Sequence, residues 1–242
     1  MSKSNVIVDV GVSNGNDTDF YLKKGFKVFG IEGDPIVCGE LESRFSSQIS
    51  TGQLELVPAV ACSANDEEIS FFVNESVQAH SKVAVSGGKS QQRKGSEYMV
   101  KTINWPAIHS RTGPVYYCKI DIEGGECEFL ESFEKATLPK YVSAECHTID
   151  PIRKLNELGY RKYKLINQCI LFQFPIPQPA KEGFRLPDHK FQHASGFFGE
   201  ELPGDKWYTY AEILDIYETI KQLKSVGTLL GKGVWFDIHA TQ

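Results

Sequence analysis

Two apolar stretches of the sequence carry ionisable side chains at every second position. These side chains are Lys119, Asp121 and Glu123 in "YYCKIDIEGGE", and Glu145 and His147 in "YVSAECH". Successive side chains of a strand point to opposite faces, so each set shares one face if its stretch is a strand. Charged groups inside buried strands are costly unless they are paired. Clusters of this kind are where pKa values shift and protons are transferred.

His147 is the first candidate for a general base, because an imidazole titrates near neutral pH. Asp121 is the rival, and Glu145 would orient His147 or tune its charge. The structural alternatives are that His147 only ends a strand, and that Lys119 forms an ion pair with Glu123 or Glu145. The acids and the histidine would also allow a divalent metal. Their spacing matches no defined metal motif, however, and no metal ligand is predicted.

A second candidate site is the glycine turn in "VDVGVSNGNDT", where Asp9 precedes Gly11 and Gly15. No Gly-Lys-Ser/Thr follows, so the turn is not a Walker A loop. Ser13 also breaks the G-x-G-x-x-G fingerprint of dinucleotide-binding proteins. This disfavours a nicotinamide-dependent oxidoreductase, and the acid at position 9 would repel a pyrophosphate. The alternative without function is a tight turn that Asp9 caps.

Three neighbouring features of this region indicate one ligand. Asp9 would attract an ammonium group. Glu32 ends the next apolar run, about twenty residues on, where an acid typically accepts hydrogen bonds from a ribose diol. The helix start near residues 16–18 offers free N–H groups to a carboxylate. A ribose, an ammonium and a carboxylate together describe S-adenosylmethionine, which is the predicted cofactor.

Five motifs also carry a family resemblance. "VDVGVSNGNDT", "VFGIEGDP", "LVPAVACSANDEEISFF", "CKIDIEGGECEFL" and "YVSAECH" follow one another over residues 6–147. In order and spacing they resemble the FkbM-type S-adenosylmethionine-dependent methyltransferases. The resemblance implies a class I methyltransferase fold and methyl transfer, usually to a hydroxyl oxygen. The chain would then be an enzyme whose acceptor is a small molecule or a glycan. The alternative that keeps the fold is a non-catalytic cofactor-binding protein.

The resemblance places the glycine turn on the cofactor loop and Glu32 on the ribose acid. It also places Asp121, Glu123 and Glu126 on the family's D-x-E-G-x-E positions. Gly33 stands where the family commonly has proline, and no acid ends the third strand to meet the adenine. Together with the residue chemistry, this gives a predicted cofactor-binding set of Asp9, Gly11, Ser13, Gly15, Thr18, Glu32, Gly33, Ala61 and Asp121. The predicted catalytic set is Asp121, His147 and Glu145.

Alternating strands and helices must position these residues. The expected strands are residues 5–10, 27–32, 54–61, 68–73, 115–122, 141–147 and 234–240, with one or two more in 160–174. The expected helices are residues 18–24, 35–45, 127–133, 152–158 and 208–223. This order predicts an α/β fold with a mainly parallel seven-stranded sheet covered by helices on both faces, and one antiparallel strand near the end. The carboxyl ends of the strands then meet at one edge, where ligands bind.

The whole chain, 1–242, is expected to be one domain, with loop 74–101 and segment 175–207 as candidate covers of the acceptor site. Their alternatives are a solvated loop and a wrap that packs its aromatic side chains on the core. Asp237 and His239, in "WFDIHA", either reach the site from a last strand or only hold that segment in place.

The composition of the chain indicates which classes of partner and which cell compartment to expect. The formal net charge is -5, which disfavours a nucleic-acid partner held by phosphate neutralisation. No apolar run reaches membrane-spanning length, so no membrane insertion is expected. The six cysteines are scattered without a C-x-x-C pair, as is typical of reduced core thiols in a cytoplasmic protein. The sequence does not indicate an oligomeric state.

Overall fold

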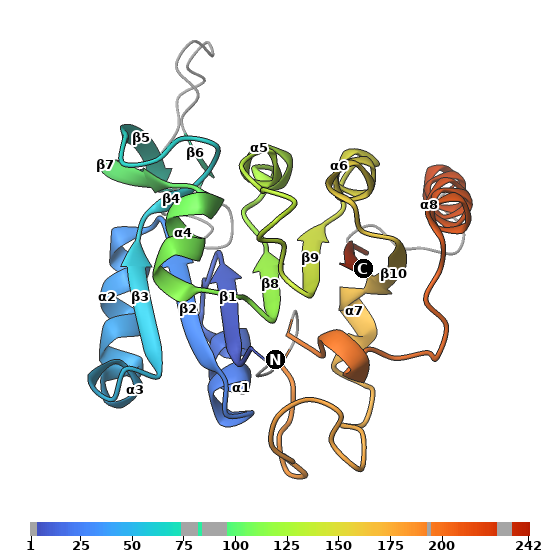
Figure 1. Cartoon of the computed structure of the whole chain (residues 1–242), viewed down its shortest axis with the longest axis horizontal. Helices are drawn as coiled ribbons and strands as arrows, with labels where there is room; N and C mark the ends of the chain where they lie inside the picture. The colour runs from blue at the N-terminus through green and yellow to red at the C-terminus, as the bar shows by residue number, and fades with distance from the viewer. Residues whose placement is uncertain (1–3, 74–81, 84–95, 193–194, 227–233) are drawn as a thin grey trace.

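The computed structural model describes residues 4–73, 82–83, 96–192, 195–226 and 234–242. Its centre is a seven-stranded sheet with the order β10-β11-β9-β8-β1-β2-β3 (Figure 1). The strands are β1 Val6–Val10, β2 Lys27–Glu32, β3 Leu54–Pro58, β8 Tyr117–Ile120, β9 Tyr141–Glu145, β10 Lys162–Asn167 and β11 Phe236–Thr241. Neighbouring strands are parallel except β11, which is antiparallel to both β9 and β10. The predicted mainly parallel sheet with one late antiparallel strand is confirmed.

Two apolar clusters cover the two faces of this sheet. One cluster packs helices α4 Trp105–Thr112, α5 Glu126–Glu131, α6 Asp150–Leu158 and α8 Tyr210–Ser225 against the sheet. The other holds side chains of α1 Asn16–Lys23 and α2 Pro35–Arg44, with the short α3 Ser46–Ser50 beside them. Strand residues alternate between the clusters: Val8 and Val10 face the first, and Ile7 faces the second. None of the helices in the described ranges is long and apolar enough to cross a membrane.

The order of the strands creates the site. The chain leaves β1 toward β2 on one side and returns to β8 on the other, so the strand order reverses between β1 and β8. In open α/β sheets, ligands bind at the carboxyl ends of the strands where the strand order reverses in this way. Asp9 and Lys119 are register partners on β1 and β8, which brings the two sequence motifs to one place.

A smaller sheet lies above the edge at β3, with the order β4-β7-β5-β6. Its strands are β4 Val60–Ala61, β5 Glu68–Val73, β6 Lys82–Val83 and β7 Ser96–Ile103. The expected strand 54–61 is therefore two strands, and residues 96–101 of the predicted loop 74–101 belong to β7. Residues 74–81 and 84–95 of that loop lie outside the described residues.

Segment 175–207 follows the short helix α7 Gln168–Leu171 and lies along the α1 face of the sheet. Phe197 and Phe198 are buried in that cluster, as the core-packing alternative expects. Lys24 of α1 and Glu201 of the 3-10 turn Gly199–Glu201 form a fully buried ion pair at 2.8 Å. These contacts fix the segment to the sheet, and its role as a cover of the acceptor site stays a prediction.

Candidate active site

The glycine turn between β1 and α1 packs on the tip of β8. Gly11 and Gly15 have φ angles of +82° and +75°, which residues with a Cβ atom rarely adopt. A Cβ atom at Gly11 would lie 1.9 Å from the carbonyl oxygen of Asp121. Any side chain at this position would therefore push the turn away from β8. The predicted cofactor loop and the predicted catalytic Asp121 are in direct backbone contact.

Asp9 lies fully buried at the end of β1. Its Oδ2 accepts a hydrogen bond from the Thr18 hydroxyl at 2.5 Å, and its Oδ1 has no hydrogen-bond partner among the described residues. Burial raises the pKa of Asp9 to about 7, although the Lys119 cation opposes the shift. A buried carboxylate oxygen without a donor needs a partner. An ammonium group of a ligand fits this requirement, and Thr18 supports Asp9 from α1.

Glu32 is held at the tip of β2 by backbone donors. Its Oε2 accepts from the Ser13 amide at 2.9 Å, and its Oε1 accepts from the Asp34 amide at 2.9 Å. Burial raises the pKa of Glu32, while these amides lower it. The two bonds fix the plane of the carboxylate, and each oxygen keeps a lone pair for the hydroxyls of a diol.

Gly33 and Ala61 lie next to Glu32. A Cβ atom at Gly33 would come within 3.1 Å of Val60 and 3.2 Å of Phe71. The family's proline would therefore crowd β5. Ala61 is buried in β4. The residue before this strand, Ala59, donates a backbone hydrogen bond to the Glu32 carbonyl at the end of β2, at 2.9 Å. Glu32, Gly33 and Ala61 therefore lie close together where β2 meets β4.

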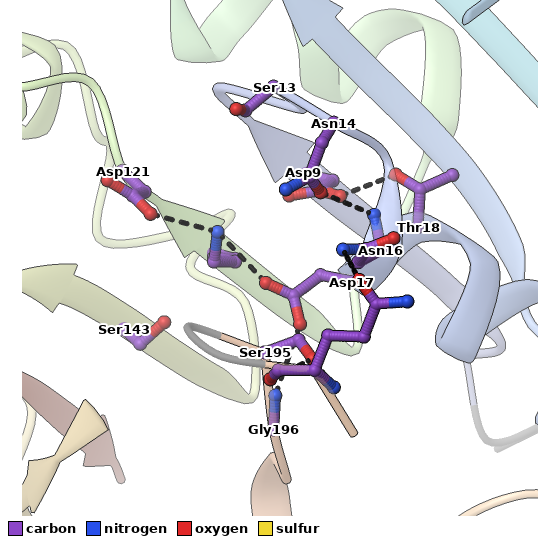
Figure 2. A network of polar contacts seen from close by, with 12 residues as sticks. Asp9, Ser13, Asn14, Asn16, Asp17, Thr18, Asp121, Ser143, Ser195 and Gly196 are labelled. Carbon is purple, nitrogen blue, oxygen red and sulfur yellow. Dashed lines mark hydrogen bonds and ion pairs between the residues drawn. The ribbon is translucent and has the colours of Figure 1, made fainter. Parts of the chain in front are cut away.

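Lys119 is placed differently from the sequence expectation. Its Nζ lies 3.1 Å from a carboxylate oxygen of Asp17 and 3.1 Å from one of Asp121 (Figure 2). Among the described residues, the ammonium of Lys119 therefore pairs with Asp17 and Asp121 and not with the expected Glu145. The reason is the strand order: β8 adjoins β1, so the first turn of α1 lies against β8 and supplies Asp17.

Asp17 is also more than a helix-start residue, which is all that the sequence indicated. It is buried, and its Oδ1 accepts the Gly196 amide at 3.2 Å. Burial raises the pKa of Asp17, and the Lys119 cation lowers it. A signal was present in the sequence, because an acid two residues after Gly15 lies in the first turn of the helix and must face either solvent or the sheet.

Glu145 and His147 meet at the tip of β9. His147 Nε2 lies 2.9 Å from Glu145 Oε2, with the histidine side chain 54% exposed and the glutamate 10% exposed. Burial raises the pKa of Glu145, and the charges of Asp121 and Glu123 act in the same direction. The structure therefore brings together the pair that the sequence singled out. Their catalytic roles remain a proposal.

The turn after β8 presents Glu123 toward this pair. Glu126 forms the turn, since its Oε1 accepts from the amides of Ile122 at 3.2 Å and Gly124 at 3.0 Å. Glu123, Glu145 and His147 then place ligand-type atoms within 4.8 Å of one another. Exposed acidic groups gather in this way without a metal, and His147 is already matched with Glu145. We assign no metal to the three side chains.

The strand β11 reaches the site from the other end of the chain. It inserts between β9 and β10, with Asp237 paired to Glu145 and His239 paired to Ser143. Both Asp237 and His239 are buried, and burial lowers the pKa of His239 to about 3. Of the two sequence alternatives for this segment, the structure favours the one in which Asp237 faces the strand tips.

Comparisons with known proteins identify one protein family and several distantly similar structures. Residues 9–162 match the model of the methyltransferase FkbM domain. No curated protein matches the chain. A crystal structure of methyltransferase FkbM from Methylobacillus flagellatus KT is similar, with TM-score 0.43 and 16% identity over 69% of this chain and 40% of that one. The chain thus spans well under half of that relative's length.

Two further solved structures are similar to the chain. Precorrin-6y C5,15-methyltransferase from Geobacter metallireducens GS-15 has TM-score 0.44 and 11% identity, over 100% of this chain and 82% of that one. A putative rRNA-methylase from Clostridium thermocellum has TM-score 0.35 and 11% identity, over 67% and 76%. These likenesses are too distant to bear on an acceptor.

Proposed function

The chain belongs to the FkbM methyltransferase family, and from that premise we propose that it transfers a methyl group from S-adenosylmethionine to a hydroxyl oxygen of a small molecule or glycan. One observation carries the proposal. The glycine turn that would hold the methyl donor touches the β8 tip, and the β9 tip beside it carries the Glu145–His147 pair. A donor loop and a proton-accepting pair are therefore adjacent.

We assign the nine predicted cofactor residues to the S-adenosylmethionine site. We assign the orphaned oxygen of Asp9 to the ammonium group and the carboxylate of Glu32 to the ribose diol. Gly11, Ser13, Gly15, Gly33 and Ala61 shape the rim, Thr18 holds Asp9, and Asp121 borders the methyl-bearing side. When bound, S-adenosylmethionine would supply a sulfonium-activated methyl carbon. The bond of this carbon to sulfur would break as its bond to the acceptor oxygen forms, with S-adenosylhomocysteine as the leaving group.

His147 is the proposed proton acceptor. Its Nε2 faces Glu145 at 2.9 Å, so we assign the acceptor's hydroxyl proton to Nδ1. The carboxyl of Glu145 orients the imidazole and stabilises the charge that forms on it. Asp121 is the alternative base: its backbone carbonyl borders Gly11, and its carboxylate already accepts a hydrogen bond from the Lys119 ammonium at 3.1 Å. That hydrogen bond already engages one oxygen of the Asp121 carboxylate.

Segment 175–207 is proposed to border the acceptor. Gln192 accepts a hydrogen bond from Asn16 at 3.0 Å, and Gly196 donates to Asp17. Both contacts fasten the segment to the first turn of α1, directly beside the glycine turn. The acceptor specificity would then reside in this segment and in the loop 74–101.

Two measurements test the proposal. Isothermal titration with S-adenosylhomocysteine and with NAD should show binding of the first only, and binding of NAD alone would overturn the assignment. Methyl-labelled S-adenosylmethionine is then incubated with cell extract. Label should enter a small-molecule or glycan fraction with the wild type and be lost with His147→Ala. Label that is released by ribonuclease would overturn the proposed acceptor class.

A further inference from the structure

A chain of side-chain contacts joins three segments that are far apart in the sequence (Figure 2). The ammonium of Lys119 on β8 lies 3.1 Å from a carboxylate oxygen of Asp17, in the first turn of α1, and 3.1 Å from one of Asp121, at the β8 tip. The other oxygen of Asp17 accepts a hydrogen bond from the Gly196 amide at 3.2 Å. One ammonium therefore connects β8 with α1 and, through Asp17, with segment 175–207.

The same segment reaches the glycine turn by a second route. The side-chain amide of Asn16 donates to the side chain of Gln192 at 3.0 Å, and the backbone amide of Gln192 donates to the Ser195 hydroxyl at 3.1 Å. On the other side, a Cβ atom at Gly11 would lie 1.9 Å from the carbonyl oxygen of Asp121, so the β8 tip packs directly on the turn. The contacts therefore form a closed ring around the first turn of α1.

The charged side chains of this ring differ in exposure. The side chains of Lys119 and Asp17 are 11% and 9% exposed, and that of Asp121 is 40% exposed. A buried ion pair is seldom more stabilising than apolar side chains of similar volume, so the gain from this arrangement is mainly one of direction.

Lys119 determines the direction of the two carboxylates that it contacts. Both lie within hydrogen-bond distance of one nitrogen, so they are close to each other and would repel without the ammonium between them. The carboxylate of Asp121 would then turn toward solvent, because it is the more exposed of the two. The carboxylate of Asp17 would stay buried without a counter-ion, and its hold on the Gly196 amide would weaken.

We propose that Lys119 and Asp17 are positioning residues of the methyl transfer, and that their ion pair aligns Asp121 beside the glycine turn with the Gly196 end of segment 175–207. The ion pair acts through these two groups, and neither of its members touches substrate or cofactor. This inference rests on the proposed function, because only there does the segment border the acceptor. A single buried cation then sets the donor side and the acceptor side relative to each other.

Amide hydrogen exchange at Gly196, followed by NMR of nitrogen-15-labelled protein, tests this connection without any acceptor. Lys119→Met removes the ammonium and keeps the length of the side chain, and Asp17→Asn removes the charge of its partner. Each should speed exchange of the Gly196 amide at least about tenfold, because the charge-assisted hydrogen bond that protects it is weakened. Unchanged exchange in both variants would overturn the proposal.

Asp19→Asn is the matched control. It removes a carboxylate from the same helix, but the ion pair of Asp19 is with Lys23 of α1, at 2.6 Å, and does not involve β8. Exchange of the Gly196 amide and the rate of methyl transfer should both stay at the wild-type value. Equally fast exchange in Asp19→Asn would mean that loss of any acid from α1 loosens the segment, and the role of Lys119 would be wrong.

Methyl transfer to extract at saturating S-adenosylmethionine tests whether the two residues act as a unit. Lys119→Met and Asp17→Asn should each lower the rate about tenfold, and the double variant should lose no more than either one, because each already breaks the ion pair. Lys119→Arg, which keeps the cation, should recover most of the rate. Losses that multiply to about a hundredfold in the double variant, or no recovery with arginine, would overturn the positioning role.

The two measurements separate this inference from the proposed function. A chain that transfers no methyl group to any extract would overturn the proposed function. Exchange of the Gly196 amide would still report whether Lys119, on β8, controls the end of the segment.

Discussion

The two ends of the candidate site satisfy their polar groups in different ways. At the β1–β2 end, the Glu32 carboxylate is held by the amides of Ser13 and Asp34, which are close in sequence or in the adjoining turn. At the β8–β9–β11 end, carboxyl groups from remote segments face one another, as Glu145 and Asp237 do. At the first end, the Glu32 part is a preformed cradle held by backbone amides, and Asp9 is the group that makes this end sensitive to pH. The second end gathers carboxyl groups from several segments, and it should respond more strongly to substitution.

The largest effect is expected from His147→Ala. Loss of a general base typically lowers a rate by about 100- to 10,000-fold, and binding of S-adenosylhomocysteine should not change because His147 lies at the other end of the site. Methyl transfer and isothermal titration on the same preparation provide the measurement. His109→Ala, in α4, is the control. If His147→Ala weakened cofactor binding as well as lowering the rate, the assignment of cofactor binding and proton transfer to different ends of the site would be wrong.

Gly11→Ala should damage the cradle next. The new Cβ atom would meet the Asp121 carbonyl at 1.9 Å in a left-handed backbone conformation, so we expect a loss of about 3 kcal/mol or more in the free energy of unfolding. Chemical denaturation measures it. Gly39→Ala, in α2, where a Cβ atom meets nothing within 4 Å, should instead be neutral or stabilising. Equal stability of the two variants would contradict the close packing of the turn.

Glu32→Gln should weaken binding of S-adenosylhomocysteine about tenfold, because one charged hydrogen-bond acceptor is lost at the ribose. The rate at saturating cofactor should change little, since Glu32 is remote from the proton-accepting pair. Glu55→Gln, on the neighbouring β3 strand and exposed, is the matched control. An unchanged affinity in Glu32→Gln would remove the ribose assignment.

The pH dependence of cofactor binding should follow Asp9. Its pKa is raised to about 7, so the carboxylate that would meet the ammonium forms as pH rises through 7. Affinity for S-adenosylhomocysteine should therefore increase from about pH 6 to about pH 8. The stability of the ligand-free protein should change in the opposite direction, because a raised pKa means that the folded state binds more protons between about pH 4 and 7. Asp9→Asn should flatten both profiles, and a flat wild-type profile would contradict the assignment.

Chelation should have the smallest effect. Because His147 already faces Glu145, EDTA is expected to leave methyl transfer unchanged, and added Mn²⁺ should not stimulate it. Transfer to extract with and without chelator is the measurement. A rate that depends on Mn²⁺ would show that the β8–β9 end works through a cation and not through the histidine alone.

The cradle could be predicted from the sequence because its parts lie in short motifs. Asp9, Gly11 and Gly15 occupy one turn, and Glu32 ends the next strand, so spacing alone places them together. The central sheet could also be predicted from the sequence, because long apolar runs alternate with helical segments. Some elements could not be predicted, because the sequences of β7 and α7 have no clear hydrophobic periodicity. The division of residues 54–61 into β3 and β4 depends on the pairing of Val60 and Ala61 with β7.

The ionic contacts of the other end could not be predicted from spacing. Lys119 has acids at several nearby positions in sequence, and the choice of Asp17 follows only from β8 lying next to β1. In the same way, the pairing of Asp237 with Glu145 requires β11 to enter between β9 and β10. Such contacts depend on strand order, which local patterns do not specify.

The insertion of β11 has a consequence for how the protein matures. In the central sheet as described, β10 is an edge strand and pairs with β11. Residues 162–167 can therefore join this sheet only after residues 236–241 have joined it. A nascent chain that has emerged as far as α8 would hold a finished nucleoside cradle beside an open sheet. The central sheet would be continuous only once residues 236–241 lie between β9 and β10.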